Sequence, residues 1–336
     1  MPRATVPGLR IALAGAGMVS RHHLIAWSRV PGAQVVAIAD PHRALAEARA
    51  VEFGIATVHA DTGTMLAEVR PDALDIAVPV HQHAALCRLA ASAGVAILCQ
   101  KPLCSTLAEA EALVAKLGDR VPFMVHENWR FRLPYRRALA LLREGMIGQL
   151  VSARLSFANS GLLGTRPALA RQPFLATLPR LIVFEVLIHH LDVLRCLIGP
   201  LAVRSAMVTC IAGATRAEDT ATILLASNAG APVLCTGTMA AAGAPPIGLD
   251  ALEILGTEGS VRFDGTRLQC EGPREVSIIW DAGEIYQSGY DACLAHFAEG
   301  LRTGSPFETS AADNLATLRL VDDVYSAAAA MPSTRP

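Results

Sequence analysis

The chain has 336 residues, with 29 lysine and arginine residues against 30 aspartate and glutamate residues and a formal net charge of −1. This balance excludes the strongly basic surface by which proteins bind nucleic acid through its phosphates. The length suits two domains better than one, and a composition of 52% hydrophobic and 18% charged residues can bury a large core.

The eight cysteines show no C-x-x-C pair and no repeated spacing, which argues against a zinc ribbon or a disulfide framework. They are typical of small buried residues in a reduced protein. The N-terminal segment lacks the basic start and apolar core of a secretion signal, and no apolar run approaches the ~20 residues of a membrane span. We therefore expect a soluble, cytoplasmic protein that binds neither nucleic acid nor membrane.

The first predicted elements surround a glycine-containing turn, Gly15 to Ser20. An apolar run over 9–14 leads into the turn, a helix-like segment over 19–30 follows it, and a second apolar run over 35–39 ends at Asp40. A dinucleotide requires this arrangement, because glycines let the backbone approach the pyrophosphate and the helix N-terminus offers N–H groups. The alternative is a strand-to-helix turn that binds nothing.

Asp40 lies roughly 20 residues beyond the turn, where an acid accepts hydrogen bonds from the adenosine ribose. A carboxylate there repels a 2′-phosphate and so favours NAD over NADP, although His42 and Arg43 could soften this preference. Ser20 stands where the fingerprint has its third glycine, and it is small enough for close helix packing.

The first part of the chain alternates short apolar runs with helical ones, which indicates a Rossmann-type parallel sheet. The predicted strands are 9–14, 34–39, 56–58, 73–78, 95–99 and 121–126. After a helix over 134–145 the rhythm changes, and one strong helix over 183–197 interrupts a series of strands. These strands are 149–158, 202–212, 219–227, 231–239, 250–256, 259–263 and 275–280, and two helices close the chain, 289–302 and 310–329.

The predicted fold class is therefore α/β, with an N-terminal Rossmann parallel sheet and a C-terminal α+β domain whose sheet is mostly antiparallel. We place a dinucleotide-binding domain at residues 1–126 and a substrate-binding and oligomerisation domain at 127–336. Ligands of open parallel sheets bind beyond the carboxyl ends of the strands, so we expect the site between the two domains. An exposed second sheet also favours a homodimer or homotetramer.

Polar side chains follow the fourth and fifth predicted strands, where a nicotinamide would bind. Lys101, locked by Pro102 after an apolar strand, is well placed to donate to a substrate oxygen; its alternative is a surface lysine beside a turn. His81 and His83 begin a predicted helix, and they either take part in catalysis or cap the helix and pack against the cofactor.

In the second domain, Glu185 and His189 are spaced i and i+4, with Asp192 three residues on, so an α-helix places all three on one face. A carboxylate that fixes the tautomer of a histidine lets it accept the proton of an alcohol as a hydride leaves. The alternative for His189 is a satisfied core histidine. The histidines could also hold a metal, but no zinc signature is complete, and we predict none.

These pieces occur in one order along the whole chain, and in that order the chain resembles the Gfo/Idh/MocA family of NAD(P)-dependent sugar and polyol oxidoreductases. The residues that carry the resemblance are Gly15 to Ser20, His23, Asp40, Pro79, His83, Lys101-Pro102, Asn128 to Phe131, Glu185 and His189. Members of the family typically have Glu-Lys-Pro where this chain has Gln100-Lys101-Pro102, and Asp-x-x-x-His where it has Glu185 to His189.

The resemblance implies that Lys101 and His189 are the catalytic pair, with Glu185 in the place of the usual aspartate. It also implies NAD, with NADP as the alternative. The cofactor-binding residues are then Gly15, Gly17, Met18, Val19, Asp40, Pro79, His83, Gln100 and Lys101. Gln100 in place of glutamate removes a charge near the nicotinamide ribose.

A narrower similarity, to the branch of the family that includes D-apiose dehydrogenases, lies in the segments at 125–131, 170–174, 179–182 and 307–310. It makes Asn128, Arg130, Arg171 and His190 candidates to bind the sugar. For the first three the alternative is an interdomain salt bridge or a loop cap. We hypothesise oxidation of a sugar or polyol hydroxyl, an aldose such as apiose being one candidate; the alternatives are an NAD-retaining glycoside-cleaving enzyme and a non-catalytic nucleotide-binding regulator.

Overall fold

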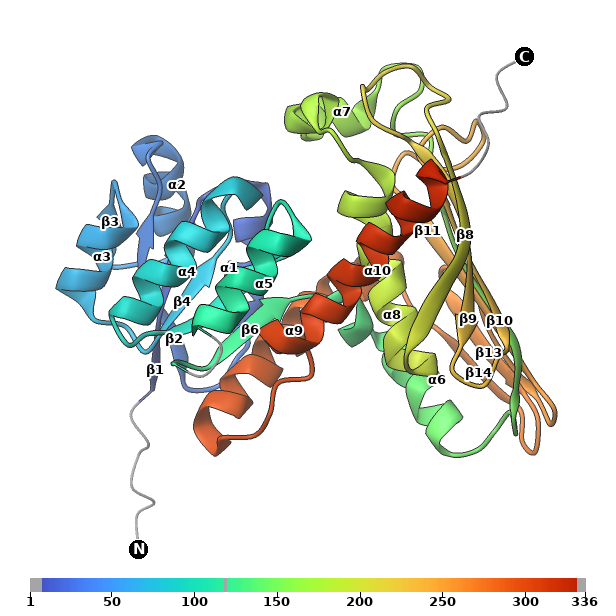
Figure 1. Ribbon diagram of the computed structural model, residues 1–336. Helices are drawn as coiled ribbons and strands as arrows, with labels where there is room; N and C mark the ends of the chain where they lie inside the picture. The colour runs from blue at the N-terminus through green and yellow to red at the C-terminus, as the bar shows by residue number, and fades with distance from the viewer. Residues whose placement is uncertain (1–7, 118–119, 331–336) are drawn as a thin grey trace, which may run out of the picture. The chain divides into compact units, whose positions relative to one another are not determined.

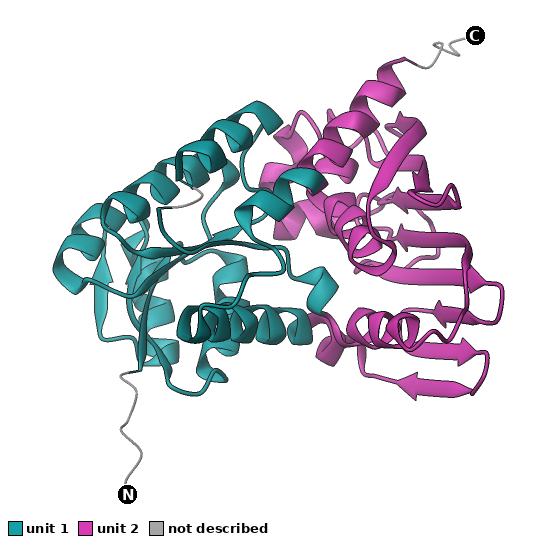
Figure 2. Ribbon diagram, turned by 60° about the horizontal axis from the view of Figure 1, so that its bottom comes forward, with its two compact units in different colours: residues 1–131, 287–316 teal, residues 132–286, 317–336 magenta. Residues whose placement is uncertain are grey.

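The computed structural model describes residues 8–117 and 120–330, and they divide into two compact units. Of the described residues, unit 1 comprises those up to 131 together with 287–316, and unit 2 comprises 132–286 together with 317–330 (Figure 2). The chain first crosses between the units close to the predicted boundary after residue 126. The return of 287–316 to unit 1 has no counterpart in the sequence-based division.

Unit 1 contains a six-stranded parallel sheet in the order β3-β2-β1-β4-β5-β6 (Figure 1). This order, with its switch between β1 and β4, confirms the predicted Rossmann-type sheet. The central strands β4 and β5 are buried at every position, as parallel strands covered by helices on both faces must be. The strands are β1 Leu9–Ala14, β2 Ala33–Ala39, β3 Thr57–His59, β4 Ala73–Ile76, β5 Ala96–Gln100 and β6 Phe123–His126.

Helices connect the strands of unit 1 and pack their apolar sides on the sheet. Leu24 of the first helix packs in one cluster with Leu13 and Ile38 from the sheet, so the glycine turn between β1 and this helix has a rigid base. The helices are α1 Met18–Ser28, α2 Arg43–Phe53, α3 Thr62–Val69, α4 His83–Ser92 and α5 Leu107–Leu117, with the 3₁₀ turns η1 Val80–Gln82 and η2 Trp129–Phe131.

Unit 2 contains an eight-stranded sheet in the order β14-β13-β12-β11-β7-β10-β9-β8. Every neighbouring pair is antiparallel except β7 with β10, which confirms the mostly antiparallel prediction. The strands are β7 Leu150–Ala158, β8 Leu201–Thr209, β9 Thr220–Ser227, β10 Pro232–Thr238, β11 Leu249–Gly256, β12 Ser260–Phe263, β13 Arg267–Glu271 and β14 Val276–Ile279.

Helices cover one face of the unit 2 sheet: α6 packs on β12, β13 and α8, and α8 packs on β7. Burial alternates along strands such as β13, whose Leu268 and Cys270 are buried while the residues between and beside them are exposed. The helices of unit 2 are α6 Leu133–Arg143, α7 Pro167–Arg171, η3 Pro173–Thr177, η4 Ile182–Leu187 and α8 Ile188–Ile198. Two further helices pass from one unit to the other along the chain: most of α9 Ala282–Thr303 belongs to unit 1, and α10 Ala311–Ala329 begins in unit 1 and continues in unit 2.

Three elements differ from the sequence-based expectation. The short strand β13 was not predicted, because three of its five residues are polar and turn signals flank it. The helix α7 was also not predicted, and α9 begins at Ala282 rather than at 289. In addition, the predicted helix over 183–197 begins as a π-helix, η4, before it continues as α8.

A buried charge network joins three elements of unit 2 around Asp250 on β11. Its carboxylate accepts hydrogen bonds from Tyr135 at 2.8 Å and from His190 at 3.0 Å, and it pairs with Arg132 at 3.2 Å. Burial alone would raise the pKa of Asp250, but the charges and hydrogen bonds of His190, Arg132 and Tyr135 outweigh it and hold that pKa below its ordinary value.

No helix within the described ranges has the length and apolar character needed to cross a membrane.

Asp250→Asn should destabilise the protein by about 3 kcal/mol, since it leaves Arg132 and His190 buried without their anion. Because the folded-state pKa of Asp250 is lowered, its contribution is fully present above the unfolded value of about 3.9 and is lost as the pH falls further through the folded value. Urea denaturation at pH 7 and at pH 3.5 measures this. An equal difference between wild type and variant at both pH values would contradict the assignment.

Candidate functional site

The turn after β1 is shaped by two glycines with different roles. Gly15 has a φ of +101°, and a Cβ there would collide with the carbonyl oxygen of Ala77, so only glycine lets the end of β1 pack against the residue that follows β4. Gly17 has ordinary dihedrals and is the N-cap of α1, with no side chain capping the helix, and a Cβ there would meet nothing within 4 Å. The helix N-terminus therefore faces open space, which suits a pyrophosphate.

Asp40 closes this turn from the end of β2. Its carboxylate accepts one hydrogen bond from the backbone N–H of Ala16 at 2.8 Å and one from that of His42 at 2.7 Å. These bonds hold the carboxylate of Asp40 in a fixed orientation beside the turn that Gly15 and Gly17 form. The arrangement fits a dinucleotide whose ribose hydroxyls donate to the acid, and it disfavours a 2′-phosphate.

His83 ties together the chain segments that follow β4 and β5. Its Nδ1 lies 2.9 Å from the carbonyl oxygen of Pro102 and its Nε2 lies 2.9 Å from that of Val78. The ring is buried, and burial is the main reason why its pKa is lowered. Because protein carbonyls face both ring nitrogens, His83 can contribute to cofactor binding only by positioning these two segments. Pro79, which lies between Val78 and η1, is exposed.

Lys101 follows β5 directly and is partly exposed. Its backbone N–H donates to Oε1 of Gln100 at 2.9 Å, and the amide nitrogen of Gln100 contacts ring nitrogens of His23 and His126. Both amide hydrogens of Gln100 thus face protein groups, and its oxygen accepts one hydrogen bond and keeps a second acceptor position. The predicted role of Gln100 in cofactor binding stays a prediction.

In unit 2, Glu185 lies in the π-helix η4 and His189 lies in the first turn of α8, 7% exposed. The side chain of Glu218 holds the start of η4, accepting from the backbone N–H of Leu181 at 3.0 Å and from the hydroxyl of Tyr325 at 2.5 Å. The wider π turn replaces the α-helical geometry from which the shared face of Glu185 and His189 was predicted. Such turns recur at functional sites.

The two other polar residues predicted beside His189 take part in networks within unit 2. His190 is fully buried and bonds to Asp250, and Asp192 accepts from the hydroxyl of Thr317 at 2.9 Å. His190 therefore anchors α8 on the sheet. A role for His190 in sugar binding stays a prediction, and it would require the ring to contact the sugar as well as Asp250.

The remaining predicted sugar-binding residues have different surroundings. Asn128 is 4% exposed, and its Nδ2 has no hydrogen-bond partner among the described residues, which makes it an available buried donor. Arg130 is also buried, and it donates to the carbonyl oxygen of Glu308 at 3.0 Å and pairs with Asp313 at 3.2 Å. Arg171 is exposed at the end of α7.

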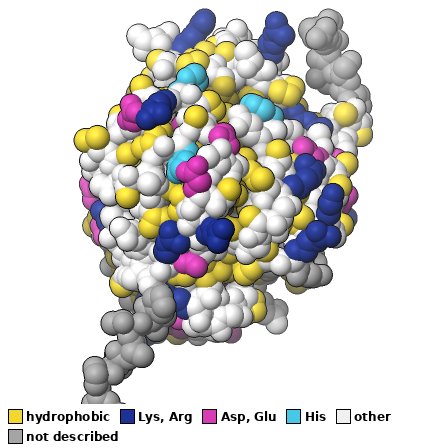
Figure 3. Space-filling view, turned by 90° about the vertical axis from the view of Figure 1, so that its left-hand side faces the viewer, with side chains coloured by type: hydrophobic (Ala, Val, Ile, Leu, Met, Phe, Trp, Pro, Cys, Tyr) yellow, Lys and Arg dark blue, Asp and Glu magenta, His cyan; other side chains and the backbone are white. Residues whose placement is uncertain are grey.

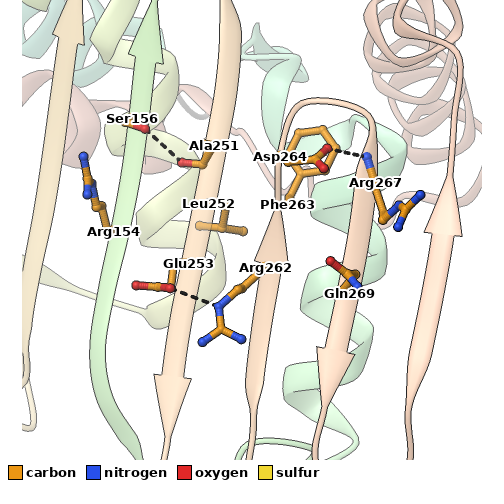
Figure 4. A pocket seen from close by; sticks show the side chains of 10 residues that line it. All are labelled: Arg154, Ser156, Ala251, Leu252, Glu253, Arg262, Phe263, Asp264, Arg267 and Gln269. Carbon is orange, nitrogen blue, oxygen red and sulfur yellow. Dashed lines mark hydrogen bonds and ion pairs between the residues drawn. The ribbon is translucent and has the colours of Figure 1, made fainter.

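The outer face of the unit 2 sheet carries a pocket of about 380 Å³ (Figure 4). Among its lining residues Arg262 pairs with Glu253 at 3.0 Å, and none of the predicted site residues lines the pocket. The face shown in Figure 3 mixes charges of both signs with histidines and apolar side chains. Within the described ranges, no group of three or more His, Cys, Asp or Glu side chains could hold a metal ion.

The sheet order, the glycine turn and the acid after β2 together define a dinucleotide-binding protein of the Rossmann class. Residues 9–121 match the family model described as an oxidoreductase family with an NAD-binding Rossmann fold, and residues 135–262 match that of the GFO/IDH/MocA C-terminal domain. The chain belongs to the Gfo/Idh/MocA family, as its motifs predicted.

Two relatives are similar over nearly the whole chain. The chain is 35% identical to the D-apiose dehydrogenase of Paraburkholderia graminis, covering 96% of this chain and 88% of the relative. It is 33% identical to the D-apiose dehydrogenase of Rhizobium rhizogenes, covering 96% and 95%.

Among solved structures, an oxidoreductase from Agrobacterium radiobacter in complex with NAD⁺, L-tartaric acid and magnesium has a TM-score of 0.89 and 32% identity over 96% of each chain. A levoglucosan dehydrogenase in complex with NADH and levoglucosan has the same fold, with a TM-score of 0.83 and 23% identity over 96% of this chain and 97% of that one.

Sequence reasoning did not find the groups that hold the site residues in place. It passed over Asp75, Glu218 and the link between Gln100 and His126, because each partner lies on another element of the fold. A single polar residue inside an apolar strand, Asp75 on β4, is the signal that could have pointed to the first of these.

Substitutions of the two glycines should separate folding from cofactor binding. Gly15→Ala should lower the free energy of unfolding by about 2 kcal/mol or more, because the new Cβ meets backbone at a strained φ. Gly17→Ala should lower the free energy of unfolding by only about 1 kcal/mol, because alanine is a poorer N-cap than glycine, but it should weaken NAD binding about tenfold or more, since the Cβ enters the space that a pyrophosphate needs. Denaturation and calorimetric titration with NAD measure the two effects; unchanged NAD affinity in Gly17→Ala would contradict this site.

Proposed function

We propose that the protein is an NAD-dependent dehydrogenase that oxidises a hydroxyl of a sugar or polyol, with an aldose such as apiose as the first candidate. Family membership supports the reaction class, and the full-length similarity to two D-apiose dehydrogenases supports the substrate class. The observation that carries the proposal is the open N-terminus of α1 beside the oriented Asp40, because it fits a dinucleotide. Bound NAD supplies the acceptor for the hydride that leaves the substrate carbon.

In this proposal Lys101 and His189 act on the same substrate hydroxyl. Lys101 donates to the oxygen and stabilises the negative charge that develops on it, which a preorganised ammonium does at little reorganisation cost. His189 accepts the hydroxyl proton, and Glu185 orients His189 or a neighbouring hydroxyl. The 7% exposure of His189 supports this role, since a general base is more effective where little water competes for its proton.

Asn128 is the strongest candidate to bind the substrate. Its buried Nδ2 lacks a protein acceptor among the described residues, and a sugar hydroxyl would supply one. Arg130 supports the neighbouring backbone through Glu308 and Asp313, so its contribution is to hold this loop in shape. The contributions of Arg171 and His190 to sugar binding remain part of the proposal.

Lys101→Met should lower kcat by about 10²-fold or more, and His189→Asn by a similar factor, because one positioned acid or base contributes ~10²–10⁴. NAD affinity should stay within about threefold of wild type in both variants. The measurement is NADH absorbance at substrate saturation, after a screen of apiose, inositols, common aldoses and deoxysugars with NAD and with NADP.

Lys116→Met is the matched control, because Lys116 lies on the exposed side of α5 and should not affect turnover. A full rate in Lys101→Met would dispose of the assigned role. Release of free sugar from a glycoside without net NADH would instead indicate an NAD-retaining glycosidase, and NAD binding without turnover of any sugar would indicate a regulator.

We further propose that the enzyme is cytoplasmic and a homo-oligomer that associates through the outer face of the unit 2 sheet. Free thiols at all eight cysteines support a reducing compartment. Exposed Met207 on β8 and Leu224 on β9, at 55% and 41% exposure, support an apolar contact on that face.

Light scattering coupled to gel filtration should give a mass at least twice the chain mass of 35.4 kDa. Introducing charge with Met207→Arg and Leu224→Arg should shift the protein to monomer, since buried unpaired charges oppose association. Val51→Arg, at an 86% exposed position of α2, is the control. A wild-type monomer at micromolar concentration would refute the proposal.

A further inference from the structure

We propose that Gln100 is a positioning residue for Lys101. We also propose that two buried histidines, His23 and His126, hold the carboxamide of Gln100 in place and that both imidazole rings are neutral. The inference rests on the proposed function in so far as it takes Lys101 to act on the substrate. Every contact that it uses lies within unit 1.

The orientation of the Gln100 amide is fixed by chemistry. The backbone N–H of Lys101 points at one atom of the carboxamide from 2.9 Å, and an N–H group can only donate. That atom must therefore be the oxygen, Oε1, and the amide cannot be flipped. The nitrogen, Nε2, then faces the two imidazole rings.

The orientation of Gln100 dictates the protonation of both rings. Nε2 carries two hydrogens and no lone pair for accepting, and it lies 2.9 Å from Nε2 of His23 and 3.1 Å from Nδ1 of His126. Both ring nitrogens must therefore accept. Each ring can carry its proton only on the other nitrogen, so His23 is protonated at Nδ1 and His126 at Nε2.

The far side of His23 agrees with this assignment. Its Nδ1 lies 2.8 Å from Oδ2 of Asp75, and the same oxygen accepts from Nε1 of Trp27 at 2.8 Å. A carboxylate accepts and does not donate, so Nδ1 of His23 is the donor. The His23 and Asp75 contact is thus a hydrogen bond from a neutral imidazole rather than an ion pair.

Burial makes this chain of bonds stiff. His23, His126 and Asp75 are 0% exposed and Gln100 is 8% exposed, so water cannot replace a lost partner. The ring of Tyr290 packs against both imidazoles, with centroids 5.5 Å from His23 and 5.1 Å from His126. The Lys101 backbone is consequently held by a side chain that itself has little freedom.

The network also accounts for glutamine where the family pattern has glutamate. A glutamate could still accept from the Lys101 N–H, but it has no N–H for either ring. To bond with it, His126 would have to change to its Nδ1–H tautomer, and His23 would have to gain a proton or give up its bond to Asp75. The titratable groups packed around the carboxamide are His23 with Asp75 behind it, His126, Tyr290 and Lys101. Glutamine is the residue that keeps both rings neutral in the tautomers assigned above while His23 retains its bond to Asp75.

Kinetics of Gln100 variants test the positioning role. Gln100→Met keeps the shape but removes all three bonds, and kcat should fall about 10- to 100-fold while KM for NAD stays within about threefold. Gln100→Glu keeps the acceptor for Lys101 and should retain a higher kcat than Gln100→Met. The control is Gln34→Met, at an exposed position of β2. An unchanged kcat in Gln100→Met, or an equal loss in the control, would overturn the role.

Histidine ring ¹⁵N spectra of the wild-type protein at pH 7 test the network without relying on activity or on the folding of a variant. The resonances are assigned with His23→Asn and His126→Asn. We expect a neutral Nδ1–H tautomer for His23 and a neutral Nε2–H tautomer for His126. A doubly protonated ring or the opposite tautomer at either position would overturn the inference.

The two hypotheses fail in different ways. Lys101→Met should leave the ring spectra unchanged, because the backbone N–H of residue 101 remains. If that variant turns over at the full rate while the spectra show the expected tautomers, the proposed function of Lys101 fails and the network stands.

Discussion

The structure depends on the way β1, β4 and β5 end side by side at one edge of the parallel sheet. Only a residue without a Cβ lets the turn after β1 pack against the carbonyl of Ala77, and His83 then bridges the segments after β4 and β5. The open start of α1 at Gly17 and the lysine after β5 are both consequences of this convergence. The helix dipole and the lysine charge are brought to the same sheet edge by backbone packing alone.

Local patterns were sufficient to predict the Rossmann sheet, the glycine turn and Asp40, because each is a short segment whose hydrophobic period and turn residues are read directly. The family could also be predicted, since Lys101-Pro102 and Glu185 to His189 follow in order. The partners of these residues could not. Gln100 meets His23 only because β5 and α1 are both neighbours of β4 in space, and sequence distance carries no record of that neighbourhood.

Unit 2 shows the same division between local and long-range information. Runs of apolar and polar residues between turn residues made most of its strands predictable from the sequence. The strand β13 was missed because three of its five residues are polar. Asp250 looked like an ordinary strand residue, and yet it joins β11 to α6 and α8 through Tyr135 and His190. Buried polar residues of this kind are recognised only when the elements around them are known.

The π-helix η4 has a consequence for how this chain tolerates changes in length. A π turn accommodates one residue more than an α turn, so removing one residue from 182–187 would let the segment relax into a regular α-helix without breaking it. Because the missing residue is the one that the wider turn accommodates, the residues before the deletion would keep nearly their present direction relative to α8. A deletion that spares Glu185 would place it three or four residues before His189 on a regular α-helix, and both spacings keep two residues on one face. The chain could therefore lose the wide turn and still present Glu185 and His189 together.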